Sequence, residues 1–224
     1  MLTLAIETST PLASVALGDE TGLLAQATLS MRVSHSESVM PDIGRLLAEG
    51  GLSPHDLGSV VVGAGPGSFT GVRVAASIAK GICFARGLPL FAYSGLLATA
   101  AGSGVRANVC ALFDARRDEV YAAAYRSLEP PVALIEPCVR AVEDVLAEVS
   151  PVAGWTFAGD GAVSFAEAIQ GRGGTVLPAE LGVPRAATLL RLGREYPELG
   201  RVGDVSDWEP SYVRASGAER ALEA

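Results

Sequence analysis

Histidine and cysteine are scarce in this chain. Its 224 residues include two histidines, at positions 35 and 55, and three cysteines, at positions 83, 110 and 138. The histidines cannot share a helix face and no C-x-x-C pair occurs, so the usual ligand sets of a metal site are missing. An odd number of widely spaced cysteines provides no disulfide framework. We therefore expect no metal site and three reduced, buried thiols.

Long apolar runs and lysine are also scarce. No stretch approaches the roughly 20 uncharged apolar residues that cross a bilayer, and the N-terminal MLTLAIETST lacks the basic segment of a signal peptide. These absences predict a soluble, cytoplasmic protein with no membrane partner. Lys80 is the single lysine, and the formal net charge is −8. Because nucleic-acid-binding surfaces carry clustered basic residues, we expect no strong direct binding of nucleic acid.

Hydrophobic residues, at 49% of the chain, are plentiful enough for a sizeable core. Short apolar runs separated by turn residues predict three consecutive strands, at residues 2–8, 13–18 and 23–29. A helix is predicted from Ser34 or Ser36, where serine hydroxyls can cap it, to the Gly50-Gly51 stop. A buried strand at 59–65 precedes a glycine-rich loop and a helix at about 72–85.

The second half of the chain repeats this order. Three strands are predicted near 107–113, 119–126 and 132–139, followed by alternating helices and strands and a last helix from about Ala186. The pattern therefore predicts two similar α/β lobes, each a mixed sheet with helices, the second one reduced. We place the lobes at residues 1–103 and 104–224, with the C-terminal segment left free to return to the first lobe.

The loop at residues 63–71, GAGPGSFTG, stands between a buried strand and a helix. Backbone N–H groups and the helix dipole can hold an anion at such a place. A P-loop, however, needs G-x-x-x-x-G-K-[ST], and here Gly71 is followed by Val72 and Arg73. A phosphate loop and a tight, glycine-dependent turn both remain open as interpretations.

Three further motifs have a structural alternative that we favour. His35 lies between two serines, but helix capping explains these residues better than a Ser-His nucleophile. The charged segment 114–119, DARRDE, offers paired carboxylates for acid-base chemistry but is typical of a solvated hairpin tip with internal ion pairs. The glycine-rich segments 159–161 and 171–174 are interpreted as turns. We therefore expect no catalytic residue.

Five segments together resemble one bacterial family over nearly the whole chain. They are IETST (6–10), HSESVMP (35–41), VVVGAGPGSFTGVRVA (60–75), DARRDEVYAA (114–123) and EPSYVR (209–214). The resemblance is to the TsaB family, also called YeaZ. It implies the two-lobed actin-like ATPase (ASKHA) fold, which is similar to actin, sugar kinases and Hsp70.

The resemblance also implies a scaffold or dimerisation role. Proteins of this family pair with a catalytic paralogue, TsaD, and an ATPase, TsaE, to make threonylcarbamoyladenosine beside the tRNA anticodon. The paralogue binds its metal through a His-x-x-x-His motif, where this chain has SGLLATAAG (94–102). The resemblance thus implies that this chain is non-catalytic, that it forms a homodimer when alone, and that it does not bind tRNA strongly by itself. It binds no cofactor alone, and ATP or ADP would lie at a subunit boundary.

In actin-like ATPases the first hairpin carries an acidic residue and small polar residues near the phosphates. The corresponding hairpin here is Glu7-Thr8-Ser9-Thr10, although any turn favours such residues. The candidate nucleotide-proximal residues are Glu7, Thr8, Ser9, Gly67, Ser68 and Thr70. A small-molecule kinase or ATPase using this hairpin is the alternative function. A metal-dependent peptidase is disfavoured, because the chain has no H-E-x-x-H.

A partner surface is predicted on the two helices of the first lobe. In the helix at 72–85, one face is expected to pack on the sheet through Ala75, Ile78, Ala79 and Ile82. Phe84 lies on the opposite, polar face, which is typical of a protein contact, unless it tucks under a neighbouring loop. The predicted interface comprises Met40, Gly44, Leu47, Arg73, Ala76, Ser77, Lys80 and Phe84.

Overall fold

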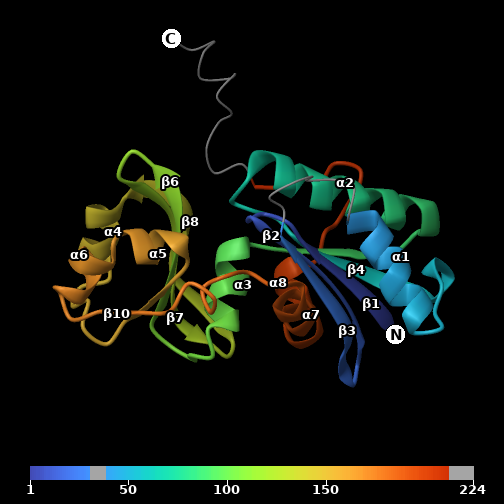
Figure 1. Cartoon of the computed structure of the whole chain (residues 1–224), viewed down its shortest axis with the longest axis horizontal. Coiled ribbons are helices and arrows are strands. Elements are labelled where there is room, and N and C mark those ends of the chain that lie inside the picture. Colours follow the sequence, from blue (N-terminus) through green and yellow to red (C-terminus); the bar gives the residue numbers. More distant parts are fainter. Residues whose placement is uncertain (31–38, 212–224) are drawn as a thin grey trace, which may run out of the picture. The chain divides into compact units, whose positions relative to one another are not determined.

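The structure is a computed structural model that describes residues 1–30 and 39–211 (Figure 1). The described chain forms two compact units. The first contains residues 1–98 together with 184–211, and the second contains residues 99–183. The second unit is thus an insertion between the two segments of the first.

The first unit is built on a five-stranded mixed sheet in the order β3-β2-β1-β4-β5. The strands β1, β2 and β3 form the predicted antiparallel meander, whereas β4 and β5 run parallel to β1. Their bounds are Leu2–Glu7, Leu12–Asp19, Gly22–Ser30, Leu57–Gly63 and Leu90–Tyr93. The continuous apolar run Val60–Val62 is buried on both faces, as a central strand between helical layers requires.

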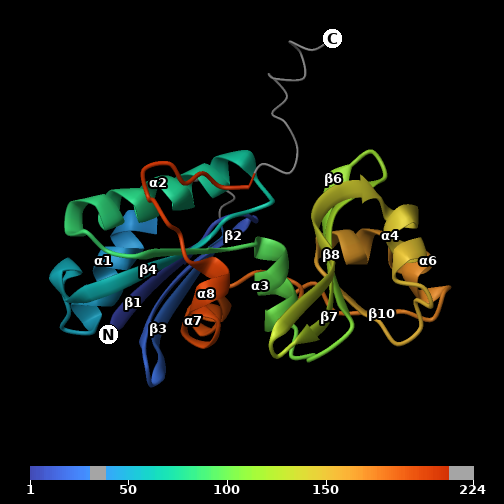
Figure 2. The same ribbon diagram turned by 180° about the vertical axis from the view of Figure 1, so that it is seen from behind.

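Helices cover both faces of this sheet (Figures 1 and 2). On one face, α1 (Val39–Glu49) and α2 (Phe69–Arg86) form a common core with Leu4, Ile6 and Val60. On the other, α7 (Ala186–Glu195) comes so close that a Cβ at Gly193 would lie 2.9 Å from Val61. Two short helices complete the unit, η1 (Pro54–Asp56) and α8 (Pro197–Gly200).

The second unit repeats the topology of the first. Its sheet has the order β8-β7-β6-β9-β10, which is again third, second, first, fourth and fifth strand. The bounds are Val109–Arg116, Glu119–Leu128, Pro131–Ala141, Thr156–Ala158 and Thr175–Val176 for β6 to β10. Because β9 and β10 are only three and two residues long, this sheet is reduced. The predicted pair of α/β lobes is confirmed.

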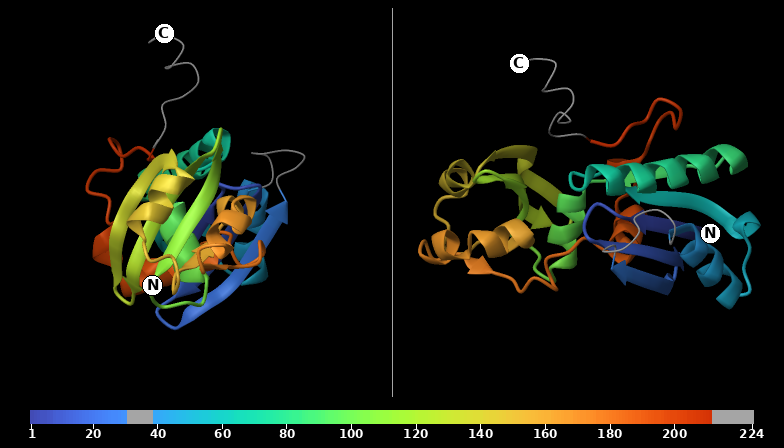
Figure 3. Two further views of the ribbon diagram at one scale, coloured as in Figure 1. Left: turned by 90° about the vertical axis from the view of Figure 1, so that its left-hand side faces the viewer. Right: turned by 45° about the horizontal axis from the view of Figure 1, so that its top comes forward.

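The helices of the second unit are short. Figure 3 shows α4 (Val142–Glu148), α5 (Asp160–Ser164) and α6 (Ala166–Gln170), which share one core with the sheet. Phe165 separates α5 from α6, so the helical segment is interrupted there. The remaining helix, α3 (Gly95–Gly102), lies where the chain passes from the first unit to the second.

Residues 201–211, which we call the strap, run along α2 in the first unit (Figure 2). The N–H of Val202 donates to the carbonyl oxygen of Leu90 at 3.0 Å. Farther along, the ammonium of Lys80 donates to the carbonyl oxygens of Ser206 and Trp208, both at 2.9 Å. The first unit therefore includes a segment that we had placed, by sequence, within residues 104–224.

The helix starts differ from the predicted ones. The predicted start of the first helix, Ser34 or Ser36, lies outside the described residues, and α1 has Pro41 in its first turn, where proline is tolerated. The second helix begins at Phe69, three residues earlier than predicted, because the Ser68 hydroxyl caps it by accepting from the N–H of Gly71 at 3.3 Å. No helix within the described residues is long and apolar enough to cross a membrane.

Candidate functional site

The β1–β2 hairpin and the glycine-rich loop meet at one edge of the first sheet. Since β1 and β4 are parallel neighbours, with Ile6 opposite Val62, their carboxyl ends lie side by side. Glu7 ends β1 and is followed by Thr8 and Ser9, and the loop 63–71 begins at the last residue of β4. We call this meeting of residues 7–9 with residues 63–71 the hairpin–loop junction.

Hydrogen bonds close the junction from both sides. The N–H of Ser68 donates to the carbonyl oxygen of Ser9 at 2.7 Å, and the hydroxyl of Thr8 donates to the carbonyl oxygen of Gly71 at 2.6 Å. A Cβ at Gly71 would overlap the carbonyl oxygen of Thr8, and one at Gly67 would overlap that of Ser9. The glycines are thus needed because two backbone segments touch here.

Glu7 is fully buried at the centre of the junction. Its Oε1 accepts from the N–H of Ser9 at 2.6 Å, whereas Oε2 has no hydrogen-bond partner within the described residues. Burial raises the pKa of the Glu7 carboxyl, and the hydrogen bonds from Ser9 and Thr8 counter this only in part. Burial therefore makes the charged form of this carboxyl group less favourable than it is in water.

Four backbone N–H groups of the junction are used within the chain. Those of Ser9 and Ser68 bind the hairpin, and those of Gly71 and Val72 bind Ser68. Lys80 is held by the strap.

The predicted nucleotide-proximal residues are only partly brought together. Glu7, Thr8, Ser9, Gly67 and Ser68 all take part in the junction. Thr70 instead is exposed on the first turn of α2 and lines a depression beside Met40 and Arg73, away from Glu7.

That depression belongs to a second candidate site on the exposed sides of α1 and α2. We call it the α1/α2 surface, and it includes Met40, Phe69, Arg73 and Phe84. Its cavity of about 420 Å³ is lined by Met40, Phe69, Thr70, Arg73, Val74, Ser77 and Ile78. Met40 and Phe69 are exposed by 51% and 43%, and the guanidinium of Arg73 stacks on the Phe69 ring at 3.9 Å. Farther along α2, Phe84 is 61% exposed. Large exposed apolar side chains on adjoining helices are typical of a protein contact.

Three residues of the predicted interface do not contribute to the α1/α2 surface. Leu47 and Ala76 are buried in the first unit, so the prediction that they form a contact surface is wrong. Lys80 donates to the strap, which occupies that flank of α2. Exposed positions of the predicted set are Met40, Gly44, Arg73, Ser77 and Phe84.

The sequence prediction missed Phe69, which it left in the loop. Phe69 and Arg73 are four residues apart, and this spacing places them on one helix face. The pair becomes visible in the sequence once Ser68 is recognised as the helix cap. Among the described residues, no group of three or more histidine, cysteine, aspartate or glutamate side chains is arranged to hold a metal ion.

The sequence comparisons match this chain to proteins of tRNA threonylcarbamoyladenosine synthesis. Residues 23–193 match the family model for TsaD, described as tRNA N6-adenosine threonylcarbamoyltransferase. The Escherichia coli tRNA threonylcarbamoyladenosine biosynthesis protein TsaB is 30% identical over 99% of this chain and 98% of its own length. The Haemophilus influenzae TsaB is 42% identical over 53% of this chain and 51% of its own length.

A solved structure extends this similarity to the fold. The structure of YeaZ from Pseudomonas aeruginosa has a TM-score of 0.80 and 30% sequence identity, and the match covers 94% of this chain and 99% of that one. Both sheets of the present chain and most of its helices therefore have a counterpart in an experimentally determined structure.

Proposed function

The chain belongs to the TsaB (YeaZ) family of tRNA threonylcarbamoyladenosine biosynthesis proteins, and we propose that it serves this pathway as a non-catalytic scaffold and dimerisation subunit. Its proposed partners are a TsaD-like catalytic paralogue, which transfers the threonylcarbamoyl group to the adenosine beside the anticodon, and a TsaE-like ATPase. It works in the cytoplasm, binds tRNA only through the complex and forms a homodimer when alone.

The hairpin–loop junction carries this proposal. An actin-like kinase or ATPase would hold phosphate between such a hairpin and loop, but here Ser68 N–H donates to the Ser9 carbonyl oxygen at 2.7 Å. Opening the junction for phosphate would break this bond and the Thr8–Gly71 bond. The chain offers no lysine in the loop to offset that loss. We therefore propose that ATP or ADP contacts this chain only at a subunit boundary.

The α1/α2 surface is the proposed partner interface. Phe84 and Met40 offer large apolar side chains, and a Cβ at Gly44 or Gly81 would meet nothing within 4 Å. Small residues beside large ones allow a partner helix to approach closely while burying the aromatic ring. The corrected interface consists of Met40, Gly44, Phe69, Arg73, Ser77 and Phe84.

Reconstitution with partners tests the function. Threonylcarbamoyladenosine formation on unmodified tRNA would be measured with TsaD, TsaE, ATP and an activated threonylcarbamoyl donor, with and without this chain. We expect product only when this chain is present, and none when this chain is the only protein. Product formed by the chain alone would establish catalysis and overturn the scaffold proposal. Full activity in the absence of the chain would show that it is dispensable.

A further inference from the structure

A second cavity of the first unit has no role in the proposed function. It lies against α7, on the face of the sheet opposite α1 and α2, and has a volume of about 580 Å³. This volume is within the range of small-molecule sites, which is about 300–1,000 Å³. None of its lining residues belongs to the hairpin–loop junction or to the α1/α2 surface.

The walls of the cavity are mainly apolar. Val61 and Phe91 contribute from the sheet, Leu190 from α7 and Leu23 from the β2–β3 hairpin. Leu23 is 49% exposed, although it is a large apolar side chain. The site therefore resembles ligand pockets, in which apolar walls enclose a few polar groups.

A hydroxyl pair supplies one of these polar groups. The Oγ1 of Thr3 and the Oγ of Ser59 are 2.8 Å apart, and Ser59 is 3% exposed. The two hydroxyl groups carry two protons, and the single hydrogen bond between them involves only one of these protons. The second proton has no acceptor within the described residues. A ligand oxygen that accepts a hydrogen bond would satisfy it.

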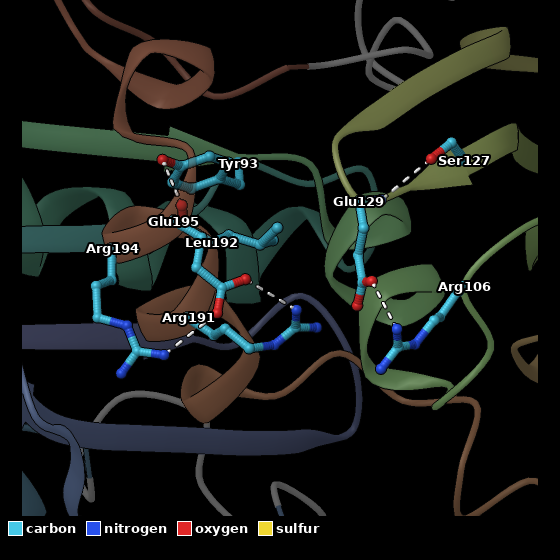
Figure 4. A network of polar contacts seen from close by, with 8 residues as sticks. All are labelled: Tyr93, Arg106, Ser127, Glu129, Arg191, Leu192, Arg194 and Glu195. Carbon is cyan, nitrogen blue, oxygen red and sulfur yellow. Dashed lines mark hydrogen bonds and ion pairs between the residues drawn. The ribbon is translucent and has the colours of Figure 1, made fainter.

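The cavity lining carries charges of both signs, and one guanidinium among them offers hydrogen-bond donors to an anion. Figure 4 shows that Arg191 and Arg194 share the carboxylate of Glu195, each at 3.2 Å. The Nε and Nη1 groups of Arg194 make no hydrogen bond with the described part of the chain. Among the acidic residues that line the cavity, Glu20 is paired with the N-terminal ammonium, and Asp19 accepts from Thr21. A guanidinium is thus left with donors available for a carboxylate or phosphate.

We propose that this cavity binds a small amphipathic anion. Its anionic group would be held by Arg194, its apolar body would lie against Val61, Phe91 and Leu190, and an oxygen atom would accept from the Thr3–Ser59 pair. No covalent step is involved. The site is independent of the proposed tRNA role, so either proposal can fail without the other.

A matched pair of probes tests the class of ligand. Indole-3-acetate and indole-3-acetamide have the same ring and shape, and only the first is charged. In a ¹H–¹⁵N NMR titration of the full chain, we expect the acetate to bind with a Kd of roughly 1 mM or below. It should shift the amide signals of Ser59, Val61 and Leu190. We expect the acetamide to bind about tenfold more weakly.

Variants test the location. Leu23→Ser should weaken indole-3-acetate binding several-fold, whereas Leu24→Ser should not, because neighbouring strand residues point to opposite faces and only Leu23 lines the cavity. The two leucines are similarly exposed, at 49% and 53%. Arg194→Gln should abolish the preference for the acetate. No saturable binding of either probe, or equal effects of the two leucine variants, would overturn the proposal.

Discussion

The Oε2 atom of Glu7 lies where the Cβ of any residue other than glycine at position 63 would be. The two residues end neighbouring parallel strands, β1 and β4, and both are buried. The carboxyl group of Glu7 therefore fits against the backbone of β4 only because position 63 has no side chain. This contact makes the hairpin–loop junction sensitive to a single methyl group.

Gly63→Ala should accordingly destabilise the fold by about 1–3 kcal/mol, the usual cost of overpacking a close contact. Gly81→Ala is the matched control, because a Cβ there meets nothing within 4 Å and the position is inside α2. Alanine at 81 should stabilise the chain by about 0.5–1 kcal/mol. Urea denaturation measures the free energy of unfolding of each variant and of the natural chain. A stability of Gly63→Ala equal to that of the natural chain would contradict the close contact.

The buried carboxyl of Glu7 predicts a pH dependence. Burial raises its pKa in the folded state, above a value of about 4.3 in the unfolded chain. The folded state then binds the proton more tightly, so Glu7 lowers the free energy of unfolding as pH rises from the unfolded pKa through the folded pKa. The slope is at most about 1.4 kcal/mol per pH unit.

Glu7→Gln removes this titration while keeping an acceptor for the N–H of Ser9. The difference in unfolding free energy, variant minus natural chain, should therefore increase between about pH 4 and pH 7. Denaturant unfolding at several pH values measures it. A difference that stays constant with pH would show that the Glu7 carboxyl has the same pKa in both states.

Phe84→Glu should weaken self-association and TsaD binding by at least about tenfold in Kd, because a buried charge replaces a central aromatic contact. Leu199→Glu is the control, since Leu199 is 58% exposed in the same unit but lies on α8. Light scattering and pull-down measure assembly, and circular dichroism reports folding. Unchanged assembly of a folded Phe84→Glu variant would rule out the α1/α2 surface.

Lys80→Met should loosen the strap. The substitution removes two hydrogen bonds from an ammonium group to the carbonyl oxygens of Ser206 and Trp208, and we expect a loss of about 1–2 kcal/mol in local stability. Hydrogen exchange of the amides at 202–211 should accelerate. The amides of β6 and β7, in the second unit, are the internal control and should keep their protection.

The isolated chain should hydrolyse ATP far more slowly than the roughly 1 per second of an ordinary kinase. The reason is that four backbone donors of its junction are already hydrogen-bonded within the chain and its loop has no lysine. A phosphate-release assay with and without the TsaD and TsaE partners measures this. Turnover near the kinase value by the chain alone would favour the kinase or ATPase alternative.

The positions of the strands along the chain could be predicted because each strand has a local sequence pattern. Apolar runs separated by turn residues mark β1 to β3, and the β-branched run at 60–62 marks the buried β4. The glycine-rich loop and the first hairpin could be named as candidates for the same reason. That they close on each other could not be predicted, because the Ser9–Ser68 bond joins residues far apart in the chain.

The buried faces of the two helices were predicted except at Leu47 and Ala76. Leu47 completes the spacing i, i+4, i+7, i+8 of one buried stripe on α1, which the sequence already contains. On α2, the predicted packing of Ile78 and Ile82 on the core of the sheet is confirmed. Val202, Val205 and Trp208 of the strap pack against the same core. That contribution from the strap has no local signal.

The insertion of one unit within the other has a consequence for synthesis. Within the described part of the chain the second unit is contiguous, so its residues 99–183 have left the ribosome once residue 183 has emerged. The first unit at that moment still lacks α7, which covers one face of its sheet. One apolar face of the β1–β5 sheet is therefore uncovered while residues 99–183 are translated.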